Sequence, residues 1–353
     1  MKILHVLVRL VAAGLLLTSA SAWAQNCRHA DGSTPLVNIA NLNGSITVGP
    51  DVPVGTEIYI TSYYAGPSNE LQCTTGNADR IRRYVTLPFP KSSYVSGRFG
   101  DNVYDTNVPG IGVVVWFNGS AFPSTQRQDV VQPTLQIYPL HTYDVSLIKT
   151  GPVGAGTLTG ASLPTFEYRM TGANSNVLIY SGHVQGSLNI VARTCTTSDV
   201  AVDLGSHQMS EIPTVGSSTA WVEVPVQLRN CPAFFGQHRN WRTTGTAQAQ
   251  LSATPNQIRY RVDPVTRVTD AGQSVMALQD DGMNATAQGI GIQMGTATDD
   301  SVRYGVARDS GLTLTETNNA SYTIRLRARY IRQAATVAAG QANGAATITL
   351  EYY

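Results

Sequence analysis

The chain of 353 residues is long enough for two ordinary domains. Charged residues make up 13% of it, about half the usual share, whereas 32 Gly and 16 Tyr are present. The 24 Lys and Arg residues nearly balance the 23 Asp and Glu residues, which excludes a nucleic-acid-binding protein that depends on a basic surplus. A hydrophobic content of 42% excludes a disordered chain. This composition is typical of a secreted all-β protein.

The first 24 residues are predicted to be a secretory signal peptide. Lys2 and Arg9 precede an apolar stretch, Leu10–Leu17, and Ala22-Trp23-Ala24 has the pattern of a cleavage site. The alternative is a membrane anchor, but this apolar stretch is shorter than the ~18 residues that a span requires. Without the signal, 22 basic residues face 23 acidic ones, so we expect an exported protein with a net charge of −1.

Four cysteines in an exported chain predict disulfides, and three pairings are possible. The gap between Cys73 and Cys195 is far longer than either flanking gap, so Cys27–Cys73 and Cys195–Cys231 is the economical pairing. A zinc site is the competing interpretation, but no C-x-x-C pair is present. Each bridge would stabilise the fold by about 4 kcal/mol through loop closure.

Six segments show the alternation of apolar and polar residues, or the short apolar run, that is typical of β-strands. They are Thr56–Ser62, Gly112–Phe117 and Thr142–Lys149 in the first half, and Trp221–Leu228, Tyr322–Tyr330 and Thr347–Tyr353 in the second. Turns rich in Gly and Pro separate them, and helix patterns are nearly absent. The predicted fold class is therefore all-β, with two β-sandwich domains.

The stretch Gly182–Thr194, just before Cys195, is the expected boundary between the two domains. We therefore predict three parts: a signal peptide at residues 1–24, an N-terminal domain at residues 25–190 and a C-terminal domain at residues 191–353.

Catalytic and metal motifs are missing. The six histidines show no metal-ligand spacing, and neither a G-x-S-x-G nor an H-E-x-x-H motif occurs. We therefore expect no enzyme activity, no metal and no cofactor, with a secreted hydrolase as the weaker alternative. The stripe Arg325, Arg327 and Arg329 could form an anion site, but a solvated sheet face is the preferred interpretation.

The second half carries a further set of motifs. Cys195 and Cys231 flank V-A-V-D-L-G and W-V-E-V-P-V-Q-L-R-N-C, and A-Q-G-I-G-I-Q-M begins at Ala287. Gly340 stands fourteenth from the end, and Tyr352 is penultimate. These features resemble a pilin domain of the chaperone–usher pathway.

The resemblance implies an incomplete immunoglobulin-like fold that lacks one strand and exposes a hydrophobic groove. A periplasmic chaperone fills that groove first, and then the N-terminal strand of the next pilin or adaptor subunit fills it at the outer-membrane usher. Gly340, Ile348, Leu350 and Tyr352 match the chaperone-recognition strand. Because a whole domain stands where a pilin carries its donor arm, the chain would accept a strand without donating one. That places it at the tip of a cell-surface fimbrium.

The first half resembles a more specific family. The segments G-S-I-T-V-G-P-D-V-P-V-G-T-E-I from Gly44, N-V-P-G-I-G-V from Asn107 and Y-D-V-S-L-I-K-T-G-P-V from Tyr143 are similar to the type 3 fimbrial tip adhesin. The resemblance implies a lectin-like adhesin domain that attaches bacteria to a host matrix protein, collagen among them, or to a glycan, and supports biofilm formation. The alternative is a non-adhesive tip subunit that initiates the fibre.

A more distant resemblance is to the mannose-binding adhesin of type 1 fimbriae, which shares the spacing of Cys27, Cys73 and Tyr84–Leu87. The sugar-holding positions of that family correspond here to Thr75, Gly76 and Arg83. The carboxylates are missing, so we expect an acidic glycan or a protein surface rather than mannose.

The expected ligand site is the loop Thr74–Arg83, which the disulfide anchors, together with nearby aromatic rings. Arg82 and Arg83 should point to opposite faces, so at most one would meet a ligand. For each tyrosine, sheet packing is the preferred alternative, and Trp116 is expected in the core. The predicted ligand-binding residues are Thr75, Gly76, Asn77, Ile81, Arg83, Tyr64 and Tyr168.

Overall fold

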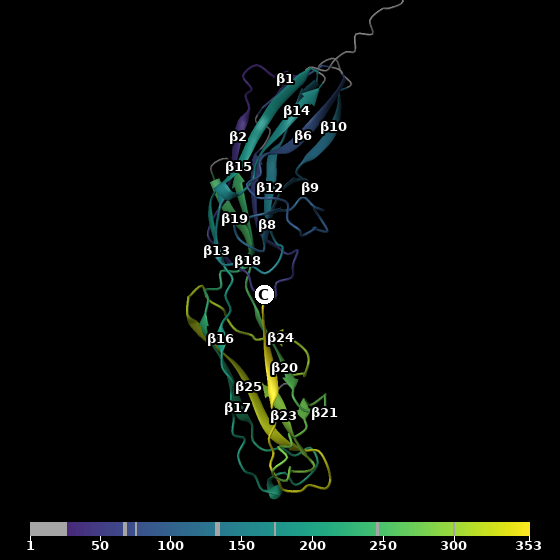
Figure 1. The fold of residues 1–353 in the computed structure, drawn as a ribbon, viewed down its shortest axis with the longest axis vertical. Helices are drawn as coiled ribbons and strands as arrows, with labels where there is room; N and C mark the ends of the chain where they lie inside the picture. Colours follow the sequence, from purple (N-terminus) through teal and green to yellow (C-terminus); the bar gives the residue numbers. More distant parts are fainter. Residues whose placement is uncertain are drawn as a thin grey trace, which may run out of the picture.

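A computed structural model describes residues 27–65, 69–74, 76–130, 135–172, 174–244, 247–298 and 301–353. The predicted all-β class is confirmed, since the helical segments among these residues are two short 3-10 turns, Gly160–Ser162 and Met209–Glu211. None of the helical segments described is long and apolar enough to cross a membrane. The predicted signal peptide and Thr75 lie outside the described residues. Figure 1 shows an elongated molecule in which the C-terminus lies where the two halves meet.

The N-terminal half is a sandwich of two large sheets and one small one. The first large sheet contains β10 (Ser124–Val130), β6 (Gly76–Thr86), β14 (Thr165–Gly172), β15 (Ser175–Val191) and β13 (Gly156–Thr159), with β2 (Leu36–Leu42) and β3 (Ser45–Thr47) parallel to β15. The second contains β18 (Gln237–Thr244), β19 (Ala247–Thr254), β4 (Glu57–Ala65), β12 (His141–Lys149), β8 (Ile111–Phe117), β7 (Tyr104–Asp105) and β9 (Ser120–Ala121). The small sheet contains β1 (Cys27–His29), β5 (Leu71–Cys73) and β11 (Leu135–Ile137).

Alternation along the strands explains how this sandwich is filled. In β12, Tyr143, Val145 and Leu147 point inward and are fully buried, while the residues between them lie on the outer face. The inward residues of the two large sheets form one hydrophobic cluster, in which Tyr143 packs edge-on against Phe166. The first five residues of β8 are buried on both faces, because a loop covers the outer side of this strand.

The second large sheet includes two strands from later in the chain. β18 runs parallel to β4, with Arg239 opposite Tyr59 and Thr243 opposite Tyr63. β19 pairs with β18 and forms the edge of the sheet. Figure 1 shows this green hairpin among the purple and teal strands of the N-terminal half. No pattern in the sequence predicts this exchange between the two halves.

The expected boundary, Gly182–Thr194, is mostly a strand rather than a linker. Residues up to Val191 belong to β15, where Val184, Leu188 and Ile190 are buried in the N-terminal core. Two glycines in this stretch give it the composition of a linker, although its apolar residues alternate. The division at residue 190 itself stays a prediction.

The C-terminal half has its own core between a sheet of six strands and a sheet of three. The larger sheet contains β16 (Thr196–Thr197), β17 (Val222–Cys231), β25 (Ala320–Arg332), β23 (Ile290–Thr296), β22 (Val275–Met276) and β21 (Val268–Asp270). The smaller contains β24 (Arg308–Asp309), β20 (Ile258–Pro264) and β26 (Ala346–Tyr352). The strands expected in this half are therefore present.

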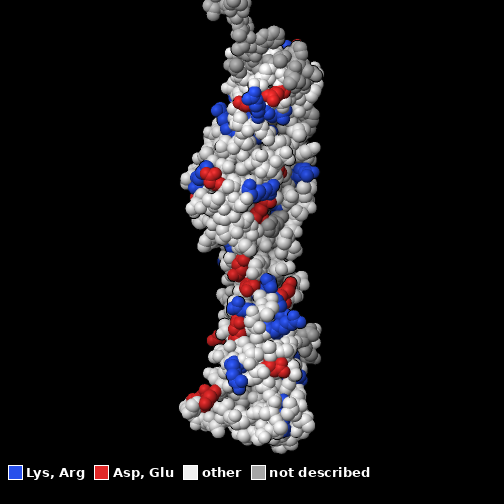
Figure 2. All heavy atoms as spheres, turned by 90° about the vertical axis from the view of Figure 1, so that its right-hand side faces the viewer, with Lys and Arg blue, Asp and Glu red and all other residues white. Residues whose placement is uncertain are grey.

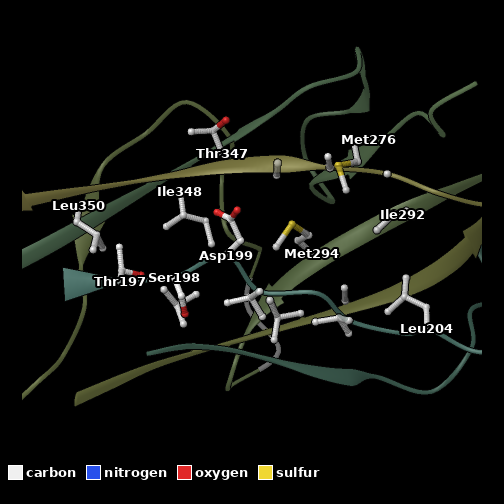
Figure 3. Close-up of a pocket in the computed structure, with 18 residues that line it drawn as sticks. Thr197, Ser198, Asp199, Leu204, Met276, Ile292, Met294, Thr347, Ile348 and Leu350 are labelled. Carbon is white, nitrogen blue, oxygen red and sulfur yellow. The ribbon is translucent and has the colours of Figure 1, made fainter. Parts of the chain in front are cut away.

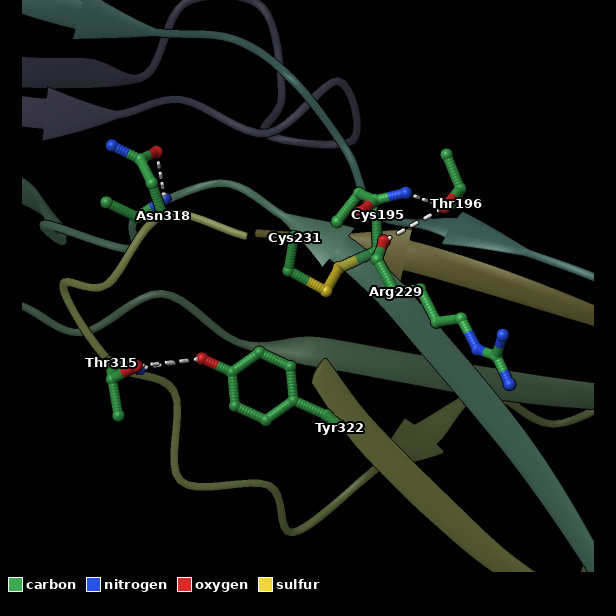
Figure 4. Close-up of a disulfide and its surroundings, with 9 residues drawn as sticks. Cys195, Thr196, Arg229, Cys231, Thr315, Asn318 and Tyr322 are labelled. Atoms are coloured by element: carbon green, nitrogen blue, oxygen red, sulfur yellow. Dashed lines mark hydrogen bonds between the residues drawn. A yellow bond between two sulfur atoms is a disulfide. The ribbon is translucent and has the colours of Figure 1, made fainter. Parts of the chain in front are cut away.

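Both predicted disulfides are confirmed, Cys27–Cys73 in the N-terminal half and Cys195–Cys231 in the C-terminal half. Cys27 and Cys73 are directly opposite each other in the pair β1–β5. Cys195 precedes β16, which Thr196 Oγ1 fixes to β17 by donating to Arg229 O at 3.0 Å (Figure 4). The first cysteine of each bridge thus stands directly at or before the first strand of its half.

The surface reflects the low charge of the sequence. Figure 2 shows that charged residues on the visible face form small clusters of both signs, separated by wide uncharged areas. A charged residue that takes part in binding therefore acts through direct contacts rather than through a large surface of one sign.

Candidate functional site

The C-terminal half contains an elongated apolar groove of about 450 Å³. Its floor is formed by Val224 and Val226 of β17, Met294 of β23 and Ala328 of β25. Figure 3 shows Ile348 and Leu350 of β26 on one side and the segment from Thr197 to Leu204 on the other. A pocket of this size is within the range of about 300–1,000 Å³ seen for binding sites.

The groove follows from strands that lack a neighbour on one side. β26 is at the edge of its sheet, since β20 is its one strand partner among the described residues. On the opposite wall, β16 pairs with β17 only at Thr196 and Thr197, and residues 198–208 then continue outside any strand. Edge strands carry unpaired N–H and C=O groups that can accept a further strand. The groove therefore offers both an apolar floor and a free backbone edge.

Two of the four predicted recognition residues line this groove. Ile348 and Leu350 line it, whereas Tyr352 is buried at the junction of the two halves. Tyr352 N donates to Asp51 Oδ2 at 2.8 Å, so the end of β26 is tied to the N-terminal half. At Gly340, a Cβ atom would lie 2.4 Å from Ala285 O, which explains why only glycine fits. Their role in chaperone recognition stays a prediction.

The predicted ligand loop Thr74–Arg83 is wrong in its secondary structure. From Gly76 onward it is β6, which pairs with β10 on one side and β14 on the other. The segment Asn77–Arg80 is mostly polar, which is typical of a loop. Its alternate residues, Ala78 and Arg80, nevertheless face the opposite sheet and are buried or half-buried there. Asn77 and Arg83 are exposed on the outer face, and Ile81 lies half-buried between them by alternation.

Arg82 and Arg83 point to opposite faces, as predicted. The Arg82 side chain is buried between the rings of Phe117 and Tyr168, 4.2 and 4.3 Å from their centroids. The Arg83 side chain is 57% exposed, and its Nε donates to Glu167 Oε1 at 2.5 Å. Glu167 also pairs with Arg169, so one carboxylate is shared by two guanidinium groups. The Arg83 side chain is therefore held in an ion pair on the sheet surface.

The structure does not bring the predicted tyrosines to that face. Tyr168 is 1% exposed, which is a correction, because a ring enclosed in the core cannot contact a surface ligand. Tyr63 and Tyr104 are also buried, in agreement with sheet packing. Tyr64 is 48% exposed but belongs to β4 in the opposite sheet. Trp116 is half-buried on the outer face of that sheet, where its Nε1 donates to Ser146 Oγ at 2.8 Å.

Two other predicted features concern charge and metal binding. In the arginine stripe of β25, Arg327 pairs with Glu223 at 2.9 Å and Arg329 donates to Gln293 at 2.8 Å, so a solvated sheet face is the interpretation that fits. In the part of the chain that the structure describes, no three His, Cys, Asp or Glu residues converge as metal ligands.

Two family models match the chain. The model described as fimbrial protein matches residues 183–353, and the MrkD-like receptor binding domain matches residues 40–186. No curated protein matches the sequence.

Several solved structures are similar at low identity. The CupB6 tip adhesin from Pseudomonas aeruginosa is 16% identical, with 93% of this chain and 94% of that chain covered and a TM-score of 0.35. The receptor binding domain of the plasmid-born adhesin MrkD1P of Klebsiella pneumoniae is 19% identical, with 49% of this chain and 98% of that chain covered and a TM-score of 0.35.

Proposed function

We propose that the chain is the adhesin at the tip of a chaperone–usher fimbrium, because residues 183–353 match the fimbrial protein model and residues 40–186 match the MrkD-like receptor binding domain. It would be exported through the periplasm and attach the bacterium to a host matrix protein or glycan, which supports biofilm growth. Both families are binding and structural proteins rather than enzymes.

The open groove is the observation that carries the assembly part of this proposal. A strand with alternating apolar residues can lie along β26, pair with its free edge and insert side chains toward Met294 and Ala328. The periplasmic chaperone would supply that strand first. The N-terminal arm of the adjacent pilin or adaptor would replace it at the outer-membrane usher.

The order of the two domains supports the tip position. The receptor-binding domain occupies the chain ahead of Cys195, where a pilin would carry its donor arm. The subunit can therefore accept a strand but has no free arm in that position to donate, so nothing can be added beyond it.

Strand addition is tested with two synthetic peptides of the same composition. In the first, Val and Thr alternate over 13 positions (a length on the order of the strands that pair in such grooves), and in the second the Val residues are grouped. The full chain is used because β18 and β19 complete the N-terminal sheet. We expect only the alternating peptide to raise the unfolding temperature. Equal shifts, or none, would contradict strand addition.

Adhesion is tested with the full chain, stabilised by the alternating peptide and coupled to latex beads. We expect the beads to bind at least one surface of a matrix-protein and glycan array, and beads that carry only the peptide to bind none. Absence of binding by folded protein, combined with loss of fimbriae when the gene is deleted, would instead indicate an initiating subunit without an adhesive role.

A further inference from the structure

The outer face of the second N-terminal sheet carries a row of polar and aromatic side chains. Ser62 of β4 is opposite Asp144 of β12 and Arg242 of β18, and Asp144 is opposite Trp116 of β8. These four residues all point outward, because their neighbours Tyr63, Tyr143 and Thr243 are buried in the sandwich. The row therefore crosses four strands, and β18 brings one of its members from the C-terminal half of the chain.

A loop covers the part of the face next to this row. Phe99 and Val103 pack on Val114 and Ile148 to form a small cluster outside the main core. The same loop holds Arg98 over the Trp116 ring, 4.2 Å from its centroid. The Arg98 side chain remains 51% exposed, and its one ion pair among the described residues is a long contact of 3.9 Å with Glu57. The loop thus presents a guanidinium group that is about half exposed to solvent.

Arg242 presents a second guanidinium group at the other end of the row. It is exposed and lies over the Tyr64 ring, 5.6 Å from its centroid. No carboxylate of the described residues is within ion-pair distance of it. An exposed arginine without an ion pair can use its guanidinium N–H groups to bind a carboxylate from another molecule.

Asp144 lies between the two arginines. Burial raises the pKa of its carboxyl group, and Glu57 raises it further, while the hydrogen bond from Ser62 and the charges of Arg98 and Arg242 lower it. Both guanidinium groups are therefore close enough to act on the same carboxylate. Asp144 and Glu57 together balance the charges of Arg98 and Arg242, so the row as a whole is near neutral. Its two guanidinium groups nevertheless remain exposed, and Arg242 has no ion pair among the described residues.

We propose that this outer face is the receptor-binding surface, and that Arg98 and Arg242 bind carboxylate groups of an acidic polypeptide. The proposal rests on the adhesin function proposed above and gives that function a site. Tryptophan, tyrosine and arginine are the residues that dominate the energy of protein–protein interfaces. The surface is complete only when β18 is in place, so the receptor site is shared between the two halves of the chain.

A polypeptide fits this surface better than a sugar. The rings of Trp116 and Tyr64 already carry a guanidinium group over one face, which leaves less aromatic surface for a sugar ring to stack on.

The test compares the binding of the full chain to two forms of gelatin. Succinylated gelatin carries additional carboxylates, and amidated gelatin has its carboxylates blocked. Chondroitin sulfate serves as the acidic glycan. The variants are Arg98→Ala, Arg242→Ala and Arg242→Lys, and the control is Arg127→Ala, which removes an exposed arginine of the other sheet that pairs with Asp129. All proteins carry the alternating peptide, and circular dichroism confirms that each is folded.

We expect the wild-type protein to bind succinylated gelatin and not amidated gelatin. Each alanine variant should bind about tenfold more weakly, and the control should be unchanged. Arg242→Lys should lose most of the affinity, because a lysine cannot bind a carboxylate bidentately. Equal binding to both gelatins, affinity unaffected by Arg98 and Arg242, or a preference for chondroitin sulfate would each overturn the proposal. If beads bind the array but these variants behave like wild type, the site is wrong and the adhesin function stands.

Discussion

A buried histidine links three parts of the N-terminal sandwich at the scale of single residues. His141 Nε2 lies 2.9 Å from Asn69 Oδ1, and Asn38 Nδ2 lies 3.3 Å from His141 Nδ1. Asn69 Nδ2 in turn donates to Ile179 O at 3.0 Å. This arrangement fits the neutral ring, with the proton on Nε2. A proton on Nδ1 would face the amide hydrogens of Asn38, so the network disfavours the charged form.

Acid should therefore destabilise the fold through His141. Burial lowers the pKa of His141 from 6.5 to about 4, so the unfolded chain takes up a proton in this range more readily than the folded chain does. The contribution is complete above pH 6.5 and is lost as the pH falls toward 4, by about 3 kcal/mol. Urea unfolding at pH 7, 5.5 and 4 measures this loss.

A variant at His141 distinguishes the contribution of this residue to the pH dependence of stability from that of the carboxylates that titrate in the same range. His141→Gln should show a smaller fall in the free energy of unfolding between pH 7 and pH 4. His207→Gln is the control, because Glu211 raises the pKa of that exposed histidine and its removal cannot relieve an acid-sensitive site. An unchanged slope in His141→Gln would contradict the assignment.

Residue-scale alternation was the most reliable information in the sequence. It placed Arg82 and Arg83 on opposite faces, and the structure agrees. Alternation does not say which face another sheet will cover, so the burial of Tyr168 and the pairing of Arg83 with Glu167 could not be predicted. The ion pair joins two strands whose paired residues are 84 positions apart along the chain.

The element that sequence patterning missed is the hairpin of β18 and β19. Its inward residues, Trp241 and Thr243, cover the N-terminal core, although the segment follows Cys231 of the C-terminal half. Parallel pairing between β18 and β4 joins residues about 180 positions apart. No local pattern specifies such a partner, because a strand signal says only that a segment is extended.

Trp241 is expected to hold this hairpin in place. It packs against the N-terminal core and is half-buried, so Trp241→Ala should remove apolar contacts worth roughly 2 kcal/mol. The amides of β4 that face β18 would then open more often. Hydrogen exchange read by mass spectrometry should show faster exchange in residues 57–65.

Gln250→Ala is the matched control for Trp241→Ala, since Gln250 is the exposed partner of Trp241 in the pair β18–β19. It should leave the exchange in β4 at the wild-type rate. If both variants exchange alike, the hairpin is held by its backbone hydrogen bonds rather than by the tryptophan.

At the scale of the whole molecule, the junction between the halves is built from short segments that hydrogen-bond to one another. Thr47 Oγ1 donates to Ala233 O at 2.8 Å, and Asn256 Nδ2 donates to Thr47 O at 2.8 Å and to Tyr353 O at 3.2 Å. A Cβ atom on Gly49 would lie 2.0 Å from Tyr352 O, so the two halves touch there without a gap. The groove and the junction share one strand, β26.

Binding of a strand in the groove should therefore stabilise the junction between the two halves. Ile348 and Leu350 line the groove, and Tyr352 of the same strand donates its N–H to Asp51 in the N-terminal half. A donor strand that pairs with the free edge of β26 restricts the motion of this strand up to its last residues. We expect the alternating peptide to slow amide exchange in residues 47–51, which do not line the groove, as measured by mass spectrometry with and without the peptide.

Asn256→Ala should weaken the junction at Thr47 while leaving the groove and the bond from Tyr352 to Asp51 intact. The substitution removes the side chain that bridges Thr47 and Tyr353 and leaves Gly236 N without its acceptor, at a cost of about 2 kcal/mol. The variant should bind the alternating peptide as tightly as the wild type, yet the peptide should slow exchange in residues 47–51 less than it does in the wild type. Asn189→Ala, an exposed asparagine of β15, should behave like the wild type. If the peptide slows exchange in residues 47–51 equally in all three proteins, this effect does not depend on Asn256. The peptide would then stabilise the junction through β26 alone.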